Sequence, residues 1–127
     1  MKIGIDAIWL FRGPISGILF IQNVLPELFR LQPEIEWHLF LNKSDKHCGL
    51  PFKKENIKIH YVWAKPKMIA NLFIIPWYAK KLKLNAVLFQ TFSPKRKSFK
   101  SIVFIHDELL EITLNIFPGK RNYIFSL

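Results

Sequence analysis

The stretch from Ser101 to Asp107 is the feature that most constrains the fold of this chain. It carries a run of β-branched and aromatic residues that stops abruptly at His106 and Asp107. Such a run predicts a strand buried on both faces, as in a parallel sheet covered by helices. In an open α/β sheet the carboxyl ends of the strands face the ligand crevice. We therefore expect the histidine and the acid to lie at a site.

The sequence upstream alternates predicted strands with predicted helices. Strand patterns occur at residues 2–8, 34–41, 57–63 and 85–90, and apolar residues recur at helical spacing in residues 17–31 and 66–84. The strand at 57–63 alternates apolar and polar residues, which places it near an edge. This order predicts an α/β fold, with a Rossmann-like parallel sheet and helices on both faces. A helical pattern that begins at Gly119 has no C-terminal cap, so the domain is expected to be incomplete at that end.

Length and composition exclude several classes of protein. The chain has 127 residues, half of them apolar, which suffices for one domain with a real core. A single cysteine, Cys48, provides no disulfide framework and is typical of a reducing compartment. Asp6 lies where a signal peptide would be apolar, and the longest apolar run, residues 68–79, is too short to span a bilayer. We therefore expect a cytoplasmic protein.

The formal net charge of +10 fits either an ordinary solvated surface or an anionic partner. Nucleic acid, acidic lipid and a phosphorylated small molecule all fit that charge. The positive residues gather at 80–83 and 95–100, without the aromatic signature of an RNA-binding module or the spacing of a zinc finger. One interpretation is therefore a non-catalytic basic α/β module that binds an anionic membrane surface or nucleic acid.

Common catalytic and cofactor motifs do not occur in the sequence. No Gly-x-Gly-x-x-Gly follows the first predicted strand, and neither a P-loop nor a serine elbow is present. His47 and Cys48 are adjacent, but two ligands without a third do not form a zinc site.

Three segments, in order, resemble the family 4 retaining nucleotide-sugar glycosyltransferases, which have the GT-B architecture. They are residues 2–7, residues 16–28, and residues 104–109 followed by Phe117 and Pro118. The resemblance covers essentially the whole chain and implies one half of a GT-B molecule, the N-terminal acceptor-binding domain over residues 1–127. The donor-binding domain is absent from the sequence.

The resemblance also implies an activity and its partners. In this family a sugar passes from a nucleotide-sugar donor to a glycan or lipid-linked acceptor, with retention at the anomeric carbon, as in polysaccharide biosynthesis. No metal or other cofactor is required, because the nucleotide-sugar is a co-substrate. We expect this fragment alone to be inactive and to bind no nucleic acid. Any membrane contact is expected to be peripheral, at the inner face of an anionic membrane.

Residue roles follow from the same resemblance. His106 matches a cleft histidine that approaches the donor sugar, where a hydrogen-bond donor stabilises developing charge; the alternative is a buried histidine bonded to a carbonyl. Asp107 orients His106 or caps the next segment. Gly13 and Gly17 match a loop whose backbone amides approach a phosphate or an acceptor, although a plain turn explains one glycine equally well. Asp6 is either a structural hydrogen-bonding group or a ligand contact.

Overall fold

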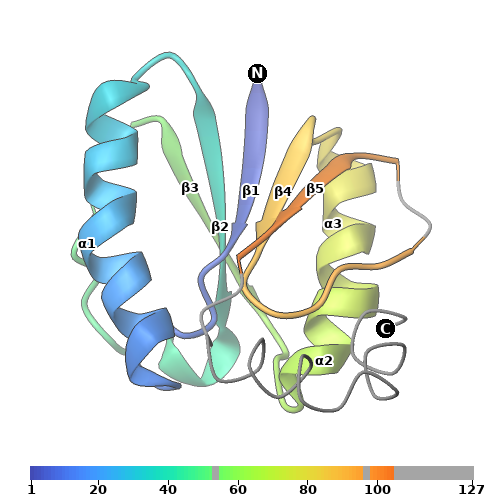
Figure 1. Ribbon diagram of the computed structural model, residues 1–127, viewed down its shortest axis with the longest axis horizontal. Coiled ribbons are helices and arrows are strands. Elements are labelled where there is room, and N and C mark those ends of the chain that lie inside the picture. Colours follow the sequence, from blue (N-terminus) through green and yellow to red (C-terminus); the bar gives the residue numbers. More distant parts are fainter. Residues whose placement is uncertain (53–54, 96–97, 105–127) are drawn as a thin grey trace, which may run out of the picture.

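The computed structural model describes residues 1–52, 55–95 and 98–104. Within these residues five parallel strands form one sheet in the order β3-β2-β1-β4-β5 (Figure 1). The strands are β1 (Lys2–Asp6), β2 (Glu36–Asn42), β3 (Ile57–Val62), β4 (Ala86–Phe89) and β5 (Lys100–Val103). The predicted α/β class and the parallel pairing are confirmed, and β3 lies at an edge as its alternating pattern predicted.

The helical segments connect successive strands. They are α1 (Ile15–Leu31), the 3-10 turn η1 (Lys43–Asp45), α2 (Lys67–Ile69), the π-helical segment η2 (Ala70–Ile74) and α3 (Ile75–Leu82). The last three follow one another without a break, so residues 67–82 form a single helical segment, as predicted for residues 66–84. None of the described helices combines the length and apolar character needed to cross a bilayer.

Each face of the sheet has its own apolar core. On one face Leu39 packs with Ile21, Leu25 and Phe29 of α1, three residues spaced so that one helix face is buried. On the other face Phe40, the next residue of β2, belongs to the core formed by η2, α3 and β4. The alternation follows from the strand period of two residues. Helical segments therefore cover both faces of the sheet.

Helix α1 is anchored by a cluster of aromatic rings. The ring of Phe29 lies 5.2 Å from that of Trp37 and 5.5 Å from that of Phe52. Phe29 is buried, and truncation of such a residue to alanine typically costs about 3–5 kcal/mol. The helix continues through Pro26 as one element, with the Pro26 ring partly exposed.

The prediction that the strand from Ser101 is buried on both faces was wrong. β5 pairs with β4 and forms an edge of the described sheet, and Ile102 is 54% exposed. Val103 and Phe104 are exposed as well. A run of β-branched residues reports strand preference, but the position of a strand in the sheet decides how much of it is covered.

The order of the strands creates a switch point between β1 and β4. From β1 the chain passes through α1 to β2 on one side, whereas residues 67–82 bring the chain from β3 back across β1 to β4 on the other side. The carboxyl ends of β1 and β4 therefore lie next to each other, on the side of the sheet where α1 and α2 begin (Figure 1). In open parallel sheets this is where ligands bind.

Candidate functional site

Asp6, the last residue of β1, is the centre of a buried polar cluster at the switch point. It is fully buried, and its Oδ2 accepts a hydrogen bond from the side-chain amide of Asn71 at 2.8 Å. The backbone N–H of Gln90 donates to the same oxygen at 3.4 Å, and that of Ile8 donates to Oδ1 at 3.2 Å. A buried carboxylate requires this many donors, because burial without them would be costly. Asp6 is therefore fully used in holding the ends of β1 and β4 together.

Lys67, the first residue of α2, neutralises this carboxylate. Its Nζ lies 2.9 Å from Oδ2 of Asp6 and donates to the hydroxyl of Thr91 at 2.9 Å. The ammonium group also lies 3.6 Å from the centroid of the Trp9 ring, a cation–π distance. Burial lowers the pKa of Lys67, and the charge and hydrogen bond of Asp6 offset part of that effect. The side chain keeps 13% exposure, so the cation is close to the surface.

Two carboxamide side chains complete the cluster, and Asp6 fixes their orientation. The Nε2 of Gln90 donates to the backbone carbonyl of Asp6 at 2.8 Å, and Asn71 uses its Nδ2 for the carboxylate. Both amide nitrogens face acceptors, so the amides cannot be flipped without placing oxygen against oxygen. Gln90 Oε1 and Asn71 Oδ1 consequently accept no hydrogen bond within the described part of the chain. Two buried acceptors beside a cation suit a ligand that carries hydroxyl groups.

The loop between β1 and α1 is held against this cluster by Trp9. Gly13 has φ of +152°, and a Cβ there would lie 2.4 Å from the Trp9 ring; at Gly17 the corresponding distance is 2.3 Å. Both positions therefore require glycine because the indole occupies the space. Arg12 Nε lies 3.3 Å from the buried Oδ1 of Asp45, a charge contact without hydrogen-bond geometry that ties the loop to η1. The packing role of the two glycines is established, and their contact with a ligand stays a prediction.

A second polar cluster lies on β2 and β3, away from the carboxyl ends of the strands. His38 Nε2 is 2.8 Å from Glu36 Oε1, and His38 Nδ1 is 2.8 Å from His60 Nε2. Because a carboxylate only accepts, His38 donates through Nε2, and its Nδ1 accepts from His60 when both rings are neutral. Burial lowers the pKa of each histidine; for His38 the hydrogen bond and charge of Glu36 oppose this effect without overcoming it. For Glu36, burial acts to raise the pKa but is outweighed by His38, Lys2 and Lys58, so the pKa is lowered.

The structure brings together three of the five site residues predicted from the sequence. Asp6, Gly13 and Gly17 lie at the same edge of the sheet, linked through Trp9 and Gln90. His106 and Asp107 lie outside the described residues, so their predicted roles stay predictions.

Three residues of the cluster were missed by the sequence reasoning. Gln90 follows β4 directly, so the argument that singled out His106 at a strand end applies to it equally. Lys67 and Asn71 gave no such signal, because a lysine and an asparagine are ordinary residues in a predicted helix. Their approach to Asp6 depends on how residues 67–82 pack on the sheet.

The cluster contains two amide oxygens, an ammonium group and the carboxylate of Asp6, which already has four hydrogen-bond or ion-pair partners. In the described residues no three His, Cys, Asp or Glu side chains gather in a group that could hold a metal ion. Comparisons with known protein families, with curated proteins and with solved structures find no match.

Proposed function

We propose that this chain is the N-terminal, acceptor-binding half of a retaining glycosyltransferase with the GT-B architecture. It would transfer a sugar from a nucleotide-sugar donor to a glycan or lipid-linked acceptor. The strand order β3-β2-β1-β4-β5 supports this proposal, because it matches the first five strands of the doubly wound Rossmann sheet, whose order is 3-2-1-4-5-6.

The observation that carries the proposal is the polar cluster at the switch point. Lys67 supplies a cation on a side chain that is 13% exposed. Gln90 and Asn71, which both bond to Asp6, supply buried acceptors that receive no hydrogen bond from the described residues. A sugar hydroxyl both donates and accepts, so it can receive a hydrogen bond from the ammonium group and give one to an amide oxygen. A phosphate on a donor or on a lipid carrier would meet the same cation.

In this proposal each of these residues has a separate role in binding or transfer. Asp6, saturated by its donors, positions Lys67 and Gln90 without touching the ligand. Gly13 and Gly17 let the loop lie against Trp9 and keep backbone amides at the rim of the site. His106 and Asp107 come three and four residues after β5 ends at Val103. There, in this proposal, His106 donates toward the reacting sugar and Asp107 orients it.

Ligand binding by the whole 127-residue chain tests the proposal. Calorimetric titrations would use nucleoside-diphosphate sugars, neutral oligosaccharides and an isoprenoid phosphate as ligands. We expect binding in at least one of these classes, weakened roughly tenfold or more by Lys67→Met, since a charge-assisted hydrogen bond is worth about 1.5–3 kcal/mol. Lys43→Met, which removes an exposed lysine of η1, should bind as the wild type does.

Because Lys67 also supports the fold, its variant requires a second measurement. Thr91→Val removes the exposed hydroxyl that holds Lys67 and should weaken binding while leaving the unfolding transition nearly unchanged. The proposal fails if none of these ligands binds, or if folded Lys67→Met binds as tightly as the wild type. In a complete transferase containing this chain, His106→Ala should lower kcat by about 10²-fold or more. An unchanged kcat would remove His106 from the site.

A further inference from the structure

The helical segment 67–82 has an outer face that is unusually apolar. Its inner face packs on the sheet through small and aliphatic residues such as Ala70, Ile75 and Ala79. The outer face carries exposed large hydrophobic residues: Met68, Ile69, Phe73 and Trp77, here called the outer stripe. The last three are spaced four residues apart, which keeps them on one side of the helix. A surface helix normally presents polar residues there.

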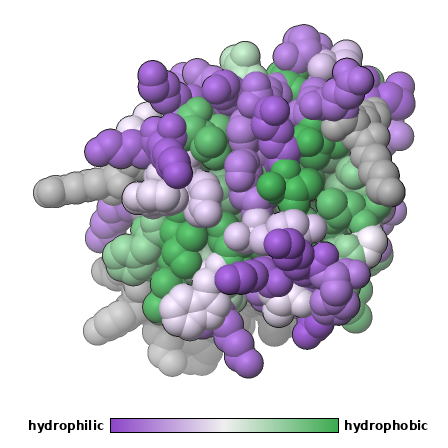
Figure 2. All heavy atoms as spheres, turned by 180° about the vertical axis from the view of Figure 1, so that it is seen from behind, coloured by the Kyte–Doolittle hydropathy of each residue, from purple (hydrophilic) through white to green (hydrophobic). Residues whose placement is uncertain are grey.

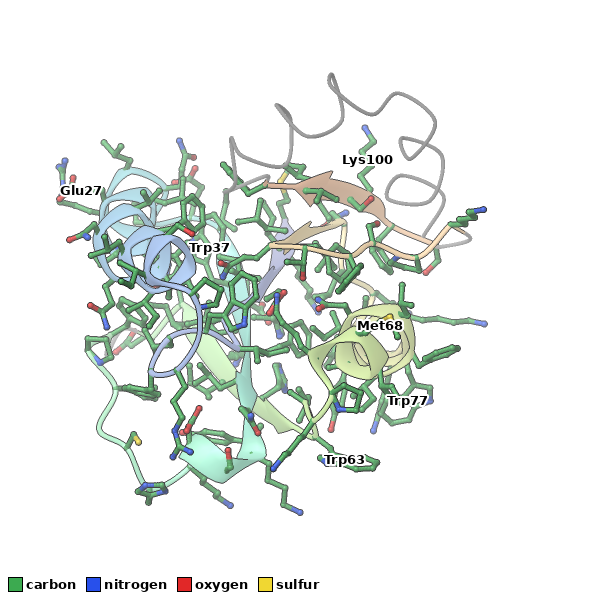
Figure 3. All side chains as sticks on the ribbon, turned by 60° about the horizontal axis from the view of Figure 1, so that its bottom comes forward. Glu27, Trp37, Trp63, Met68, Trp77 and Lys100 are labelled. Atoms are coloured by element: carbon green, nitrogen blue, oxygen red, sulfur yellow. The ribbon has the colours of Figure 1, made fainter. Side chains whose placement is uncertain are left out.

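The exposure of this stripe is large and extends beyond the helix. Phe73 is 67% exposed and Trp77 is 57% exposed. Trp63, which directly follows β3 and precedes α2 by four residues, is 65% exposed. Figure 2 shows hydrophobic residues gathered below hydrophilic ones on the side formed by α2, η2 and α3. Figure 3 shows Trp63, Met68 and Trp77 on that same side of the molecule, away from α1. Large hydrophobic residues exposed together on one side of a molecule are typical of an interaction surface.

Among the described residues, lysines adjoin the outer stripe. Lys80 and Lys81 follow Trp77 by one helical turn, and Lys81 Nζ lies 4.9 Å from the centroid of the Trp77 ring. Residues 56–106 contain ten lysines and arginines and no aspartate or glutamate, whereas positive and negative residues balance in the rest of the chain. The whole net charge of +10 therefore comes from the region that carries the stripe.

We propose that the outer stripe, together with Trp63 and the neighbouring lysines, docks on the surface of an anionic lipid bilayer. Large apolar side chains at the centre, tryptophans at the border and lysines beyond them form the pattern of a helix that lies in the interface. Two other occupants fit less well. A second copy would bring two strongly positive surfaces together. The apolar side chains at the centre of the stripe have no charge or hydrogen-bond donor for the phosphates of a nucleic acid.

Flotation of the full chain with lipid vesicles tests this docking. One set contains phosphatidylglycerol in phosphatidylcholine, and the other contains phosphatidylcholine alone. We expect strong partitioning into the anionic set and at least about a tenfold loss with Phe73→Ser combined with Trp77→Ser. Lys80→Gln and Lys81→Gln should each cost roughly fivefold, a loss that shrinks at high salt.

Matched control variants separate the stripe from general stickiness and general charge. Leu19→Ser with Val24→Ser removes two exposed apolar residues from α1, and Lys43→Gln with Lys46→Gln removes two lysines from the loop after β2. Neither pair should alter partitioning as much as the matching stripe or lysine pair does.

Several results would overturn the docking surface. The first is no binding to anionic vesicles, and the second is equal binding to neutral ones. The third is retention of binding by the Phe73→Ser, Trp77→Ser variant. The fourth is a wild-type dimer that the same substitutions dissolve, since the stripe would then contact a second copy. Displacement of the chain from vesicles by the polyanion heparin, with the stripe variant binding vesicles normally, would assign the lysines to a nucleic-acid-like ligand.

Discussion

The burial of the ion pair between Asp6 and Lys67 predicts how much its variants change the free energy of unfolding. Asp6 is fully buried and the Lys67 side chain is 13% exposed, so water screens their contact little. Replacing Asp6 by Asn keeps the shape but places an amide N–H₂ against the donors of Lys67 and Asn71, or, when flipped, against the N–H of Ile8. Either orientation leaves buried donors facing each other.

The expected cost follows from the burial of the pair. Removing one partner of a buried ion pair costs about 3–5 kcal/mol, so Asp6→Asn should lower the free energy of unfolding by that amount. Lys67→Met should cost less, about 1–3 kcal/mol, because Asp6 keeps one side-chain and two backbone donors and methionine retains an apolar stem. The double variant should be more stable than the sum of the two losses predicts, by about 1–3 kcal/mol.

Urea unfolding followed by circular dichroism measures all four proteins of this cycle. An exposed ion pair serves as the control: Arg30 Nη2 lies 2.7 Å from Glu27 Oε2, yet Glu27→Gln should leave the midpoint nearly unchanged because solvent screens that contact. The reasoning is refuted if Asp6→Asn and Lys67→Met add to within about 0.5 kcal/mol, or if Asp6→Asn is as mild as Glu27→Gln.

Two further predictions concern the loop after β1 and the histidine pair. Gly17→Ala should destabilise the fold by about 1–3 kcal/mol because its Cβ meets Trp9 at 2.3 Å, whereas Gly49→Ala, with no atom within 4 Å, should be neutral in the same urea experiment. Equal effects at both glycines would contradict the packing role. Acidification should reduce stability from pH 6.5 downward, because burial lowers the pKa of His38 and His60 and the unfolded chain takes up protons first. The free energy of unfolding should stop falling below the lowered pKa values, and it should depend less on pH when both histidines are replaced by Gln. A free energy of unfolding that stays constant between pH 7 and pH 5 would show that burial does not lower the pKa values of these histidines.

Much of the fold could be predicted from the sequence because its signals are local. Strands such as residues 85–90 and helices such as residues 17–31 are visible as apolar periods, and each corresponds to a described element. Parallel pairing followed from the alternation of the two kinds of element, since parallel neighbours require a crossover. The edge position of β3 followed from its alternating polar residues, Lys58 among them.

The candidate site was predictable only in part. Asp6 could be found because it ends a strand, but its four donors come from positions 2 to 84 residues away in the chain. The glycine requirement at 13 and 17 likewise depends on where the Trp9 ring packs. Local patterns hold no information on such contacts.

The sequence by itself determined the class of the fold, the order of its elements and the concentration of positive charge in one half of the chain, because propensity, period and charge are properties of consecutive residues. The tertiary structure alone decided that Lys67, Asn71 and Gln90 converge on Asp6, and that β5 is exposed at an edge. It also decided that Phe73 and Trp77 remain exposed although their pattern suits a core. The physical reason is that burial depends on what lies opposite a side chain in space, and the neighbours along the chain do not specify it.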